Sequence, residues 1–513
     1  MSQSVVDGLT RELSAQLRGN VLASEEDRAK YSKDESIFRI VPRVIVAPRD
    51  ERDVQSTVEI AGHFRVPLTA RGGGTSVAGQ AIGPGIVLDF TRYMNGILDV
   101  SGDHVIVQPG VVLDHVNSVL AQKGRRIAPD PSSRASCTVG GMVGNNASGP
   151  HAFKHGDTRC HVARLRAVLA DGTALESDEM PERFQTLTEE IRKSGSEIRA
   201  AQPETAKNSS GYALASLLSK RPDYTGLVVG SEGTLALVSE ITLRTIPVPA
   251  VTSTVVFAFE SMEDALAAVP ALRSSRPAAI ELVDQYILHA LAGLDAGISD
   301  RLALGTAEAS LWVEWEGQAP DITLSSHAVT LKGSQEQEHL WHLRSRASKA
   351  LQEAGGSRRP LRCIEDGVVP APHLGAYVAE LREILLRHDC DGAVFGHAGD
   401  AHIHVNPMVN LRAAHLPRRL ESLMEDAYSL LLRLGGSIAG EHGDGLLRGK
   451  FAGRQWSGLG HLFKAVRAAF DPHGLLNPDK KTFAAPDFGR LLREDLLEPP
   501  APICLRSNPV TTS

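Results

Sequence analysis

The chain has 513 residues, more than one ordinary hydrophobic core accommodates, so we expect two to four domains. Hydrophobic residues make up 42% of it and charged residues 22%, which is typical of a globular protein and excludes extensive disorder. The formal net charge of −7 argues against nucleic acid or an anionic membrane as the partner.

The number and spacing of the cysteines and the lack of long apolar segments exclude further classes of protein. The five cysteines form no Cys-x-x-Cys pair, which disfavours a disulfide framework and a cysteine-ligated iron–sulfur cluster. The N-terminus has no apolar core of signal-peptide length, and no segment approaches the roughly 18 apolar residues of a transmembrane helix. We therefore expect a cytoplasmic protein without a transmembrane segment.

The first elements of the chain lead into a glycine-rich loop. Residues 1–37 are expected to form a helical leader. Val44–Val46 then predicts a buried strand, a helical period starts at Asp53, and Val66–Thr69 predicts a second strand. The order strand, helix, strand and glycine loop is typical of a phosphate-binding unit.

Two glycine-rich segments indicate a dinucleotide. Residues 70–80 read ARGGGTSVAGQ and residues 136–149 read SCTVGGMVGNNASG. Consecutive glycines let the backbone approach a ligand, and their bare amide groups can form a concavity that binds a diphosphate. Neither segment matches the G-x-G-x-x-G fingerprint, so a nicotinamide Rossmann site is disfavoured and FAD is favoured. The alternative for either segment alone is an ordinary tight turn.

Strands and helices alternate through the rest of the first half. Further strands are predicted at residues 86–90, 105–107, 165–170, 227–229 and 240–243, with a helix over 112–123. This mixture predicts an α+β flavin-binding domain over residues 38–247.

A second domain is expected over residues 248–480. Strands are predicted at 254–259, 278–283 and 311–315, with a helix over 262–273. Strands separated by helices of this length suit an antiparallel, ferredoxin-like sheet with helices on one face, which we interpret as an α+β cap. Residues 481–513 are expected to form a C-terminal tail whose last part is poorly ordered.

Three histidines within eight positions mark the cap. They lie in GHAGDAHIHVNP, residues 396–407. Two short strands around an Ala-Gly-Asp turn would place His397 opposite a residue near His402, with His404 on the same face. Two imidazoles at this spacing are within joint reach of a metal ion. The alternative is a set of hydrogen-bonded histidines without a ligand role.

A carboxylate and an imidazole stand side by side in GEHGDG, residues 440–445. Glu441 can complete a His-His-carboxylate set that leaves positions on Zn²⁺ or Mn²⁺ open for a substrate oxygen. His442 can then serve as a nearby base. The alternative for this pair is a surface turn.

Seven motifs in this order resemble those of a known family. Besides the four segments already quoted, they are KNSSGY at 207–212, VVGSEGTLALVSEITLR at 228–244 and FDPHGLLNPDK at 470–480. The sequence resembles the FAD-linked oxidases with a vanillyl-alcohol-oxidase (PCMH) type of flavin domain, most of all the D-lactate, glycolate and D-2-hydroxyglutarate dehydrogenases. The resemblance covers residues 38–480 and implies a two-part PCMH-type FAD-binding domain followed by the cap.

The resemblance also implies which residues bind FAD. They are Arg71, Gly72, Gly73, Gly74, Thr75, Ser76, Pro109, Gly110, Thr138, Gly141, Asn145, Ser148, Gly149, Glu232 and Gly233. Family members that attach the flavin covalently often use a histidine near the first glycine loop. Residues 70–80 contain none, so we expect noncovalent FAD.

In the cap, the resemblance implies metal ligands at His397, His404 and Glu441 and an active-site histidine at His442. Arg344, in a Trp-x-x-Arg motif, would hold the substrate carboxylate. The implied reaction is oxidation of a 2-hydroxy acid to the 2-oxo acid by hydride transfer to the flavin, with metal assistance.

The sequence departs from the family at one place and leaves alternatives open. Many relatives have Gly-Asn where this chain has Ala401-His402, which bears on the substrate. The rival functions are oxidation of a sugar or other alcohol and binding of flavin or metal without turnover. Some relatives carry a cysteine-rich iron–sulfur half, but Cys504 is the only cysteine here beyond residue 481. We therefore expect a separate electron acceptor, whether an electron-transfer protein, a quinone or oxygen, and allow for a homodimer.

Overall fold

The computed structural model describes residues 3–179, 181–302, 304–325, 327–331, 333–353, 358–483 and 487–496. The last part of the expected tail, with Cys504, lies outside these ranges. Among the helices of the described ranges, none is long and apolar enough to cross a membrane.

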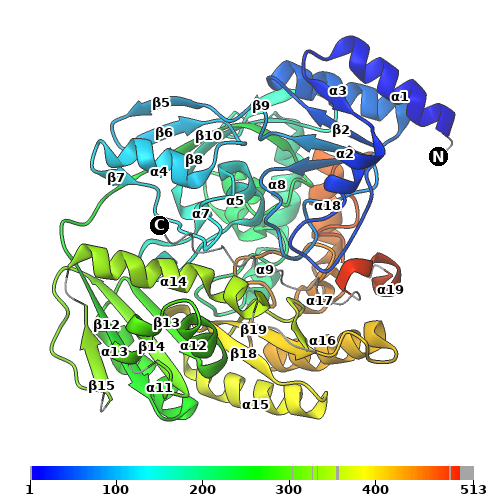
Figure 1. Ribbon diagram of the computed structural model, residues 1–513. Coiled ribbons are helices and arrows are strands. Elements are labelled where there is room, and N and C mark those ends of the chain that lie inside the picture. The colour runs from blue at the N-terminus through cyan, green and yellow to red at the C-terminus, as the bar shows by residue number, and fades with distance from the viewer. Residues whose placement is uncertain are drawn as a thin grey trace, which may run out of the picture.

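A four-stranded sheet carries the first glycine loop (Figure 1). Its spatial order is β1 (Asn20–Leu22), β2 (Val44–Ala47), β4 (Ile86–Asp89) and β3 (Leu68–Arg71). β2 and β3 both run parallel to β4 because α3 (Glu51–Phe64) crosses over between them. The Asp50 side chain caps α3 at its start, and α1 (Gln3–Gln16) packs on it. The residues expected as a purely helical leader thus also supply a strand, since β1 pairs with β2.

An antiparallel five-stranded sheet forms the other part of the N-terminal half. Its order is β5 (Ile97–Ser101), β6 (His104–Val107), β10 (Leu237–Arg244), β8 (Val162–Val168) and β9 (Ala174–Glu176). The helices in this part of the chain are α4 (Leu113–Ala121), α5 (Val139–Asn145), α6 (Ala152–His155), α7 (Thr158–His161), α8 (Arg183–Lys193), α9 (Gly195–Ala201) and α10 (Tyr224–Val228).

The strand expected over residues 227–229 is wrong, because α10 covers most of it. The side chain of Asp223 accepts a hydrogen bond from the amide of Gly226 and caps this short helix. A short apolar run is compatible with a strand or a buried helix, and here the N-terminal hydrogen bond to Asp223 favours the helix.

The cap contains an antiparallel sheet of eight strands, called here the cap sheet. Along it lie β15 (His327–Thr330), β12 (Thr252–Phe259), β14 (Ala309–Glu316), β13 (Ala279–Asp284), β18 (Gly392–His397), β19 (His402–Val409) and β16 (Arg359–Pro360), while β17 (Gly367–Val368) also pairs with β19. The antiparallel sheet is as expected. The helices, however, cover both faces instead of one.

Alternate residues of the cap strands enter two different cores. Phe257 and Leu311 pack with α11 (Met262–Ser274) and α15 (Leu374–Arg387). Val256 and Trp312 pack instead with α12 (Gln285–Ala292) and α14 (Ser334–Glu353). Because both faces are apolar, the strands lack the polar alternation of a sheet with one solvated side. Figure 1 shows α14 on the side of the cap sheet that faces the N-terminal half.

The chain returns to the N-terminal half after the cap sheet. α16 (Leu416–Arg433) stays beside α15, but α18 (Gly460–Phe470) packs on α8, and Leu476 forms a β-bridge with Leu68 (Figure 1). α17 (Gly449–Gln455) lies between α16 and α18 in the sequence. The last part of residues 248–480 therefore joins the two halves.

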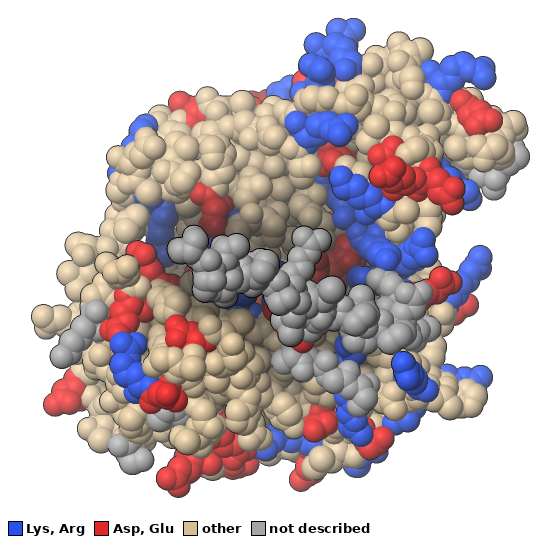
Figure 2. Space-filling view, in the orientation of Figure 1, with Lys and Arg blue, Asp and Glu red and all other residues tan. Residues whose placement is uncertain are grey.

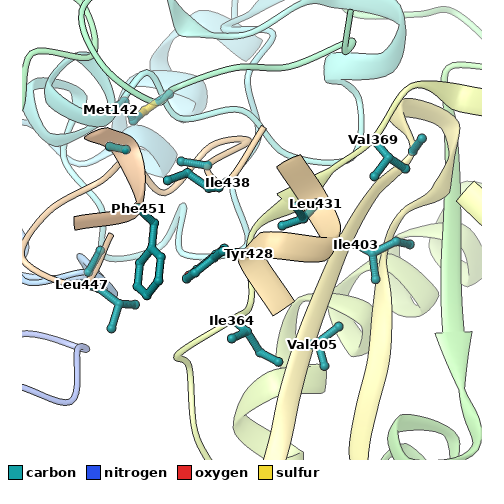
Figure 3. Close-up of a cluster of buried hydrophobic side chains, with 14 of the residues drawn as sticks. Met142, Ile364, Val369, Ile403, Val405, Tyr428, Leu431, Ile438, Leu447 and Phe451 are labelled. Carbon is teal, nitrogen blue, oxygen red and sulfur yellow. The ribbon is translucent and has the colours of Figure 1, made fainter. Parts of the chain in front are cut away.

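A buried cluster of apolar side chains forms where these segments meet (Figure 3). Met142 of α5, Ile403 and Val405 of β19, Tyr428 of α16 and Phe451 of α17 are each at most 3% exposed. Burial of each such side chain stabilises the fold by roughly 1.5–3 kcal/mol. Since Ile403 and Val405 point into this core, the histidines that alternate with them point to the opposite side of β19.

Acidic and basic side chains are interspersed on the face shown in Figure 2. Lys and Arg occur among Asp and Glu over both the N-terminal elements and the cap. This face therefore carries no extended field of a single sign.

Candidate active site

One cavity of about 680 Å³ is lined by both glycine segments and by the cap. From the cap it receives Arg344, His404, Glu441 and His442. The residues predicted for FAD that line it are Arg71, Gly72, Gly73, Gly74, Thr75, Ser76, Pro109, Thr138, Gly141, Asn145, Ser148, Glu232 and Gly233. Gly110 and Gly149 do not line it: a Cβ on Gly110 would lie 2.1 Å from the carbonyl oxygen of Phe90, which explains the glycine by packing.

The two glycine segments pack against each other and fit a cradle for a dinucleotide. A Cβ on Gly72 would lie 2.0 Å from Thr138 Oγ1, and one on Gly73 would lie 2.1 Å from the carbonyl oxygen of Ser136. The Thr138 hydroxyl also caps α5 by accepting from the amide of Gly141. A Cβ on Gly144 would meet no atom of the described residues within 4 Å, and this glycine lines the cavity. Gly72 and Gly73 thus let the two segments pack closely, whereas Gly144 leaves backbone exposed where a ligand can approach.

Glu232 lines the cavity but turns its carboxylate toward the GEHGDG loop. Its Oε1 accepts from the amide of Asp444 at 2.6 Å and lies 3.2 Å from Lys481 Nζ. Its backbone is left-handed, with φ of 59°. The side chain therefore holds the cap loop onto the first half, while the direct cofactor contact of Glu232 stays a prediction.

The expected histidine hairpin is formed by β18 and β19. His397 pairs directly with His402 in the register of the two strands, and Phe395 pairs with His404. The turn between the strands is η3 (Ala398–Asp400), closed by a left-handed Ala401 with φ of 52°. All three imidazoles are nearly or fully buried.

Three atoms of the predicted metal ligands form a nearly equilateral triangle. His404 Nε2 lies 3.4 Å from His397 Nε2, and Glu441 Oε1 lies 3.3 Å from each. Donors about 2.0–2.1 Å from a tetrahedral Zn²⁺ are about 3.4 Å apart, so the spacing fits a divalent ion. His397 is buried and does not line the cavity, whereas His404 and Glu441 do, so an ion here would border the cavity.

Glu441 is held by groups from the N-terminal half. Its Oε2 accepts from the Ser148 hydroxyl and from the amide of Gly149, and it lies 3.6 Å from Lys207 Nζ. Burial alone would raise the pKa of Glu441, but His397 and Lys207 hold it well below its ordinary value. The carboxylate is therefore ionised, as a metal ligand requires.

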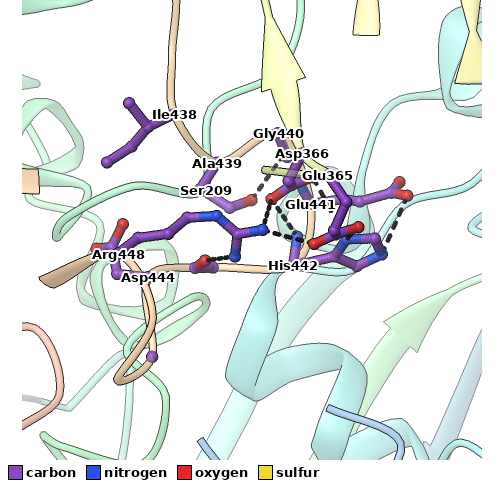
Figure 4. A network of polar contacts seen from close by, with 12 residues as sticks. Ser209, Glu365, Asp366, Ile438, Ala439, Gly440, Glu441, His442, Asp444 and Arg448 are labelled. Atoms are coloured by element: carbon purple, nitrogen blue, oxygen red, sulfur yellow. Dashed lines mark hydrogen bonds and ion pairs between the residues drawn. The ribbon is translucent and has the colours of Figure 1, made fainter. Parts of the chain in front are cut away.

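His442 faces the cavity with a pair of carboxylates behind it (Figure 4). Its Nδ1 lies 2.8 Å from Glu365 Oε2, and Arg448 Nη2 lies 2.5 Å from Glu365 Oε1. Asp366 accepts from the backbone amides of Glu441 and His442. Burial lowers the pKa of His442, but Glu365 and Asp366 raise it more, so it ends above its ordinary value. Neighbouring carboxylates thus make this imidazole a stronger base than a free histidine.

Glu281 of β13 joins the predicted metal site to the predicted substrate arginine. Its Oε1 lies 2.6 Å from His397 Nδ1 and its Oε2 lies 2.6 Å from Arg344 Nη2. Burial by itself would raise the pKa of Glu281, but His397 and Arg344 lower it to about 2. Arg344, on α14, also stacks over Phe395, with its Cζ 5.3 Å from the ring centroid. This carboxylate therefore orients two predicted site residues at once.

His151 connects the two halves beside the cavity. Its Nδ1 lies 2.6 Å from Asp130 Oδ2, and its Nε2 lies 2.9 Å from Glu314 Oε1 in the cap sheet. Burial lowers the pKa of His151, but the two carboxylates raise it more, to about 10. The imidazole is therefore charged in the folded protein near neutral pH.

Sequence reasoning missed several residues that build the site. They are Lys207, Glu281, Glu365, Asp366 and Arg448. A signal was present for the acids, since each interrupts an apolar run, AIELV around Glu281 and CIEDGVV around Glu365 and Asp366. Charged groups in such runs are seldom fully buried unless they are paired.

Comparison with known proteins agrees with this fold. The family described as "FAD binding domain" matches residues 42–178, and "FAD linked oxidases, C-terminal domain" matches residues 248–481. In the p-cresol methylhydroxylase structure with substrate bound, the fold is similar with a TM-score of 0.69 and 13% identity, over 94% of this chain and 98% of that one. The mixed fold and its two-part FAD-binding arrangement are therefore confirmed.

A relative of similar length shows the family. The chain is 30% identical to the glycolate oxidase subunit GlcD of Bacillus subtilis, over 89% of this chain and 93% of that protein. It is also 30% identical to the D-2-hydroxyglutarate dehydrogenase of Pantoea ananatis, over 90% of this chain but only 50% of that protein. The chain thus spans about half the length of the D-2-hydroxyglutarate dehydrogenases that it matches. It belongs to the FAD-linked oxidase family, and FAD is its cofactor.

Proposed function

We propose that the chain oxidises a 2-hydroxy acid to the corresponding 2-oxo acid. The observation that carries the proposal is the single cavity shared by the glycine cradle and by Arg344, His404, Glu441 and His442. D-2-Hydroxyglutarate dehydrogenases and glycolate oxidase subunits, which are relatives of this chain, are named for substrates of this class. FAD, when bound in the cradle, supplies the hydride acceptor that no side chain provides.

The chain's own residues orient the substrate and take its proton. Arg344 offers a guanidinium at the cavity wall, where a carboxylate can bind through two hydrogen bonds. His442, which lines the cavity, accepts the hydroxyl proton at Nε2, the ring nitrogen 3.5 Å from Glu441 Oε1, while its Nδ1 lies 2.8 Å from Glu365 Oε2. His397, His404 and Glu441 would hold a divalent ion, Zn²⁺ or Mn²⁺, which lowers the barrier to loss of that proton when bound.

The test is anaerobic bleaching of the flavin by candidate substrates. We expect D-2-hydroxyglutarate, D-lactate or glycolate to bleach the flavin absorbance of the purified protein, and sugars or alcohols without a carboxylate to leave it unchanged. Arg344→Ala should slow bleaching at least tenfold, while Arg346→Ala, an exposed arginine on the same helix, should not. If only compounds without a carboxylate bleach the flavin, and if they do so at the same rate in Arg344→Ala, the substrate is an alcohol and not a 2-hydroxy acid. No bleaching by any compound would favour a binding protein.

The fate of the electrons belongs to the same proposal. We infer that the reduced flavin passes its electrons to a separate acceptor, which is an electron-transfer protein, a quinone or oxygen. The acceptor is identified by testing which of these reoxidises the bleached flavin. Noncovalent attachment of FAD, a homodimer and a cytoplasmic location stay predictions as well. Release of free flavin on denaturation would support the noncovalent form.

A further inference from the structure

His402 occupies a position in the hairpin that no role yet explains. It lies two residues from His404 on the same face of β19 and directly opposite His397. The centroid of its ring lies 5.2 Å from that of His397 and 4.6 Å from that of His404. One potential ligand atom from each of His397, His402, His404 and Glu441 lies within 4.8 Å of all the others.

The hydrogen bonds of the three imidazoles follow one pattern. His397 directs Nδ1 to Glu281 Oε1 at 2.6 Å, and His404 directs Nδ1 to the carbonyl oxygen of Glu365 at 2.6 Å. His402 directs Nε2 to Asp366 Oδ1 at 2.9 Å. Each of these oxygens accepts a hydrogen bond from the nitrogen that faces it, so in the neutral imidazole the other ring nitrogen carries the lone pair that can bind a metal.

The free nitrogens of the first two histidines belong to the ligand triangle, whereas that of His402 has no hydrogen-bond partner among the described residues. His402 is fully buried, and its Nδ1 makes no hydrogen bond to any described residue. A buried acceptor without a partner is unfavourable, so the site calls for a group that takes up this lone pair. A cation among the four side chains does so.

We propose that His402 Nδ1 is a fourth protein ligand to the ion held by His397, His404 and Glu441. The inference rests on the proposed metal assistance and deepens it. Three imidazoles and one carboxylate favour a borderline ion such as Zn²⁺ over the harder Mn²⁺, which prefers oxygen ligands. The ion must then expand beyond four ligands to admit a substrate oxygen.

The deciding measurement is X-ray absorption at the zinc edge of the FAD-bound protein loaded with Zn²⁺. We expect three imidazole ligands in the wild type and two in His402→Asn. Competition with a zinc-binding dye should show a loss of at least tenfold in Zn²⁺ affinity for His402→Asn and a smaller loss in Mn²⁺ affinity. The matched control is His327→Asn, the same change at an exposed position on β15 of the cap sheet.

The outcomes separate this inference from the function beneath it. Two imidazoles in the wild type would overturn the fourth ligand and leave the three-ligand site intact. A wild type that takes up no ion, while hydroxy acids still bleach its flavin, would overturn the metal assistance and the fourth ligand but not the oxidation. The count in the wild type decides alone, so a His402→Asn protein that fails to fold does not remove the test.

Discussion

Glu281 offers the sharpest test of how the cap positions its site. Glu281→Gln keeps the size of the side chain and removes the charge that pairs with His397 and Arg344. The neutral amide no longer holds the proton on His397 Nδ1 with a carboxylate, so the imidazole becomes a poorer and less oriented ligand. We therefore expect weaker metal binding, although Glu281 itself is outside the ligand triangle.

The lowered pKa of Glu281 indicates how strongly its carboxylate is paired. A pKa of about 2, against an ordinary 4.5, corresponds to about 3 kcal/mol of net interaction with the ionised carboxylate. His397 is the largest favourable contributor to this shift, and we expect loss of its carboxylate partner to weaken zinc binding by at least tenfold. This lies within the roughly 10–100-fold that loss of such a partner usually costs.

The assay is competition between the protein and a zinc-binding dye, followed by absorbance. Glu316→Gln is the control, because Glu316 contacts Lys154 and His155 away from the ligand triangle. FAD content measured in the same samples shows whether the variants are folded. Equal zinc dissociation constants for Glu281→Gln and the wild type would refute the idea that this carboxylate orients His397.

Two other predictions concern pH and the glycine cradle. The folded pKa of His151, about 10, exceeds the unfolded value of about 6.5, so its stabilisation is complete below about 6.5 and is lost as pH rises through about 10. The difference in urea midpoint between wild type and His151→Gln should therefore shrink between these pH values, and a constant difference would contradict the ion pairs. Gly72→Ala places a Cβ 2.0 Å from Thr138 Oγ1, so the bound FAD per protein should fall severalfold. Gly62→Ala, where a Cβ meets no atom of the described residues within 4 Å, should retain its FAD.

The sequence by itself determined the features that depend on neighbouring residues. The glycine segments, the hairpin that places His397 opposite a residue near His402, and the adjacent Glu441 and His442 follow from local spacing, because strand periodicity and turn length fix which side chains share a face. The family motifs allowed FAD to be predicted as the cofactor, because each motif is a short contiguous stretch of sequence.

Only the tertiary structure decided which distant groups meet. Glu281 reaches His397 across 116 positions, and Lys207 reaches Glu441 from the other half of the molecule. The strands of the cap sheet are apolar on both sides, and helices cover both faces. The apolar sequence of a strand does not by itself show whether helices pack on one face of its sheet or on both. Periodicity assigns a side chain to a face, whereas its partner across that face depends on the order of strands in the sheet and on the docking of the two halves.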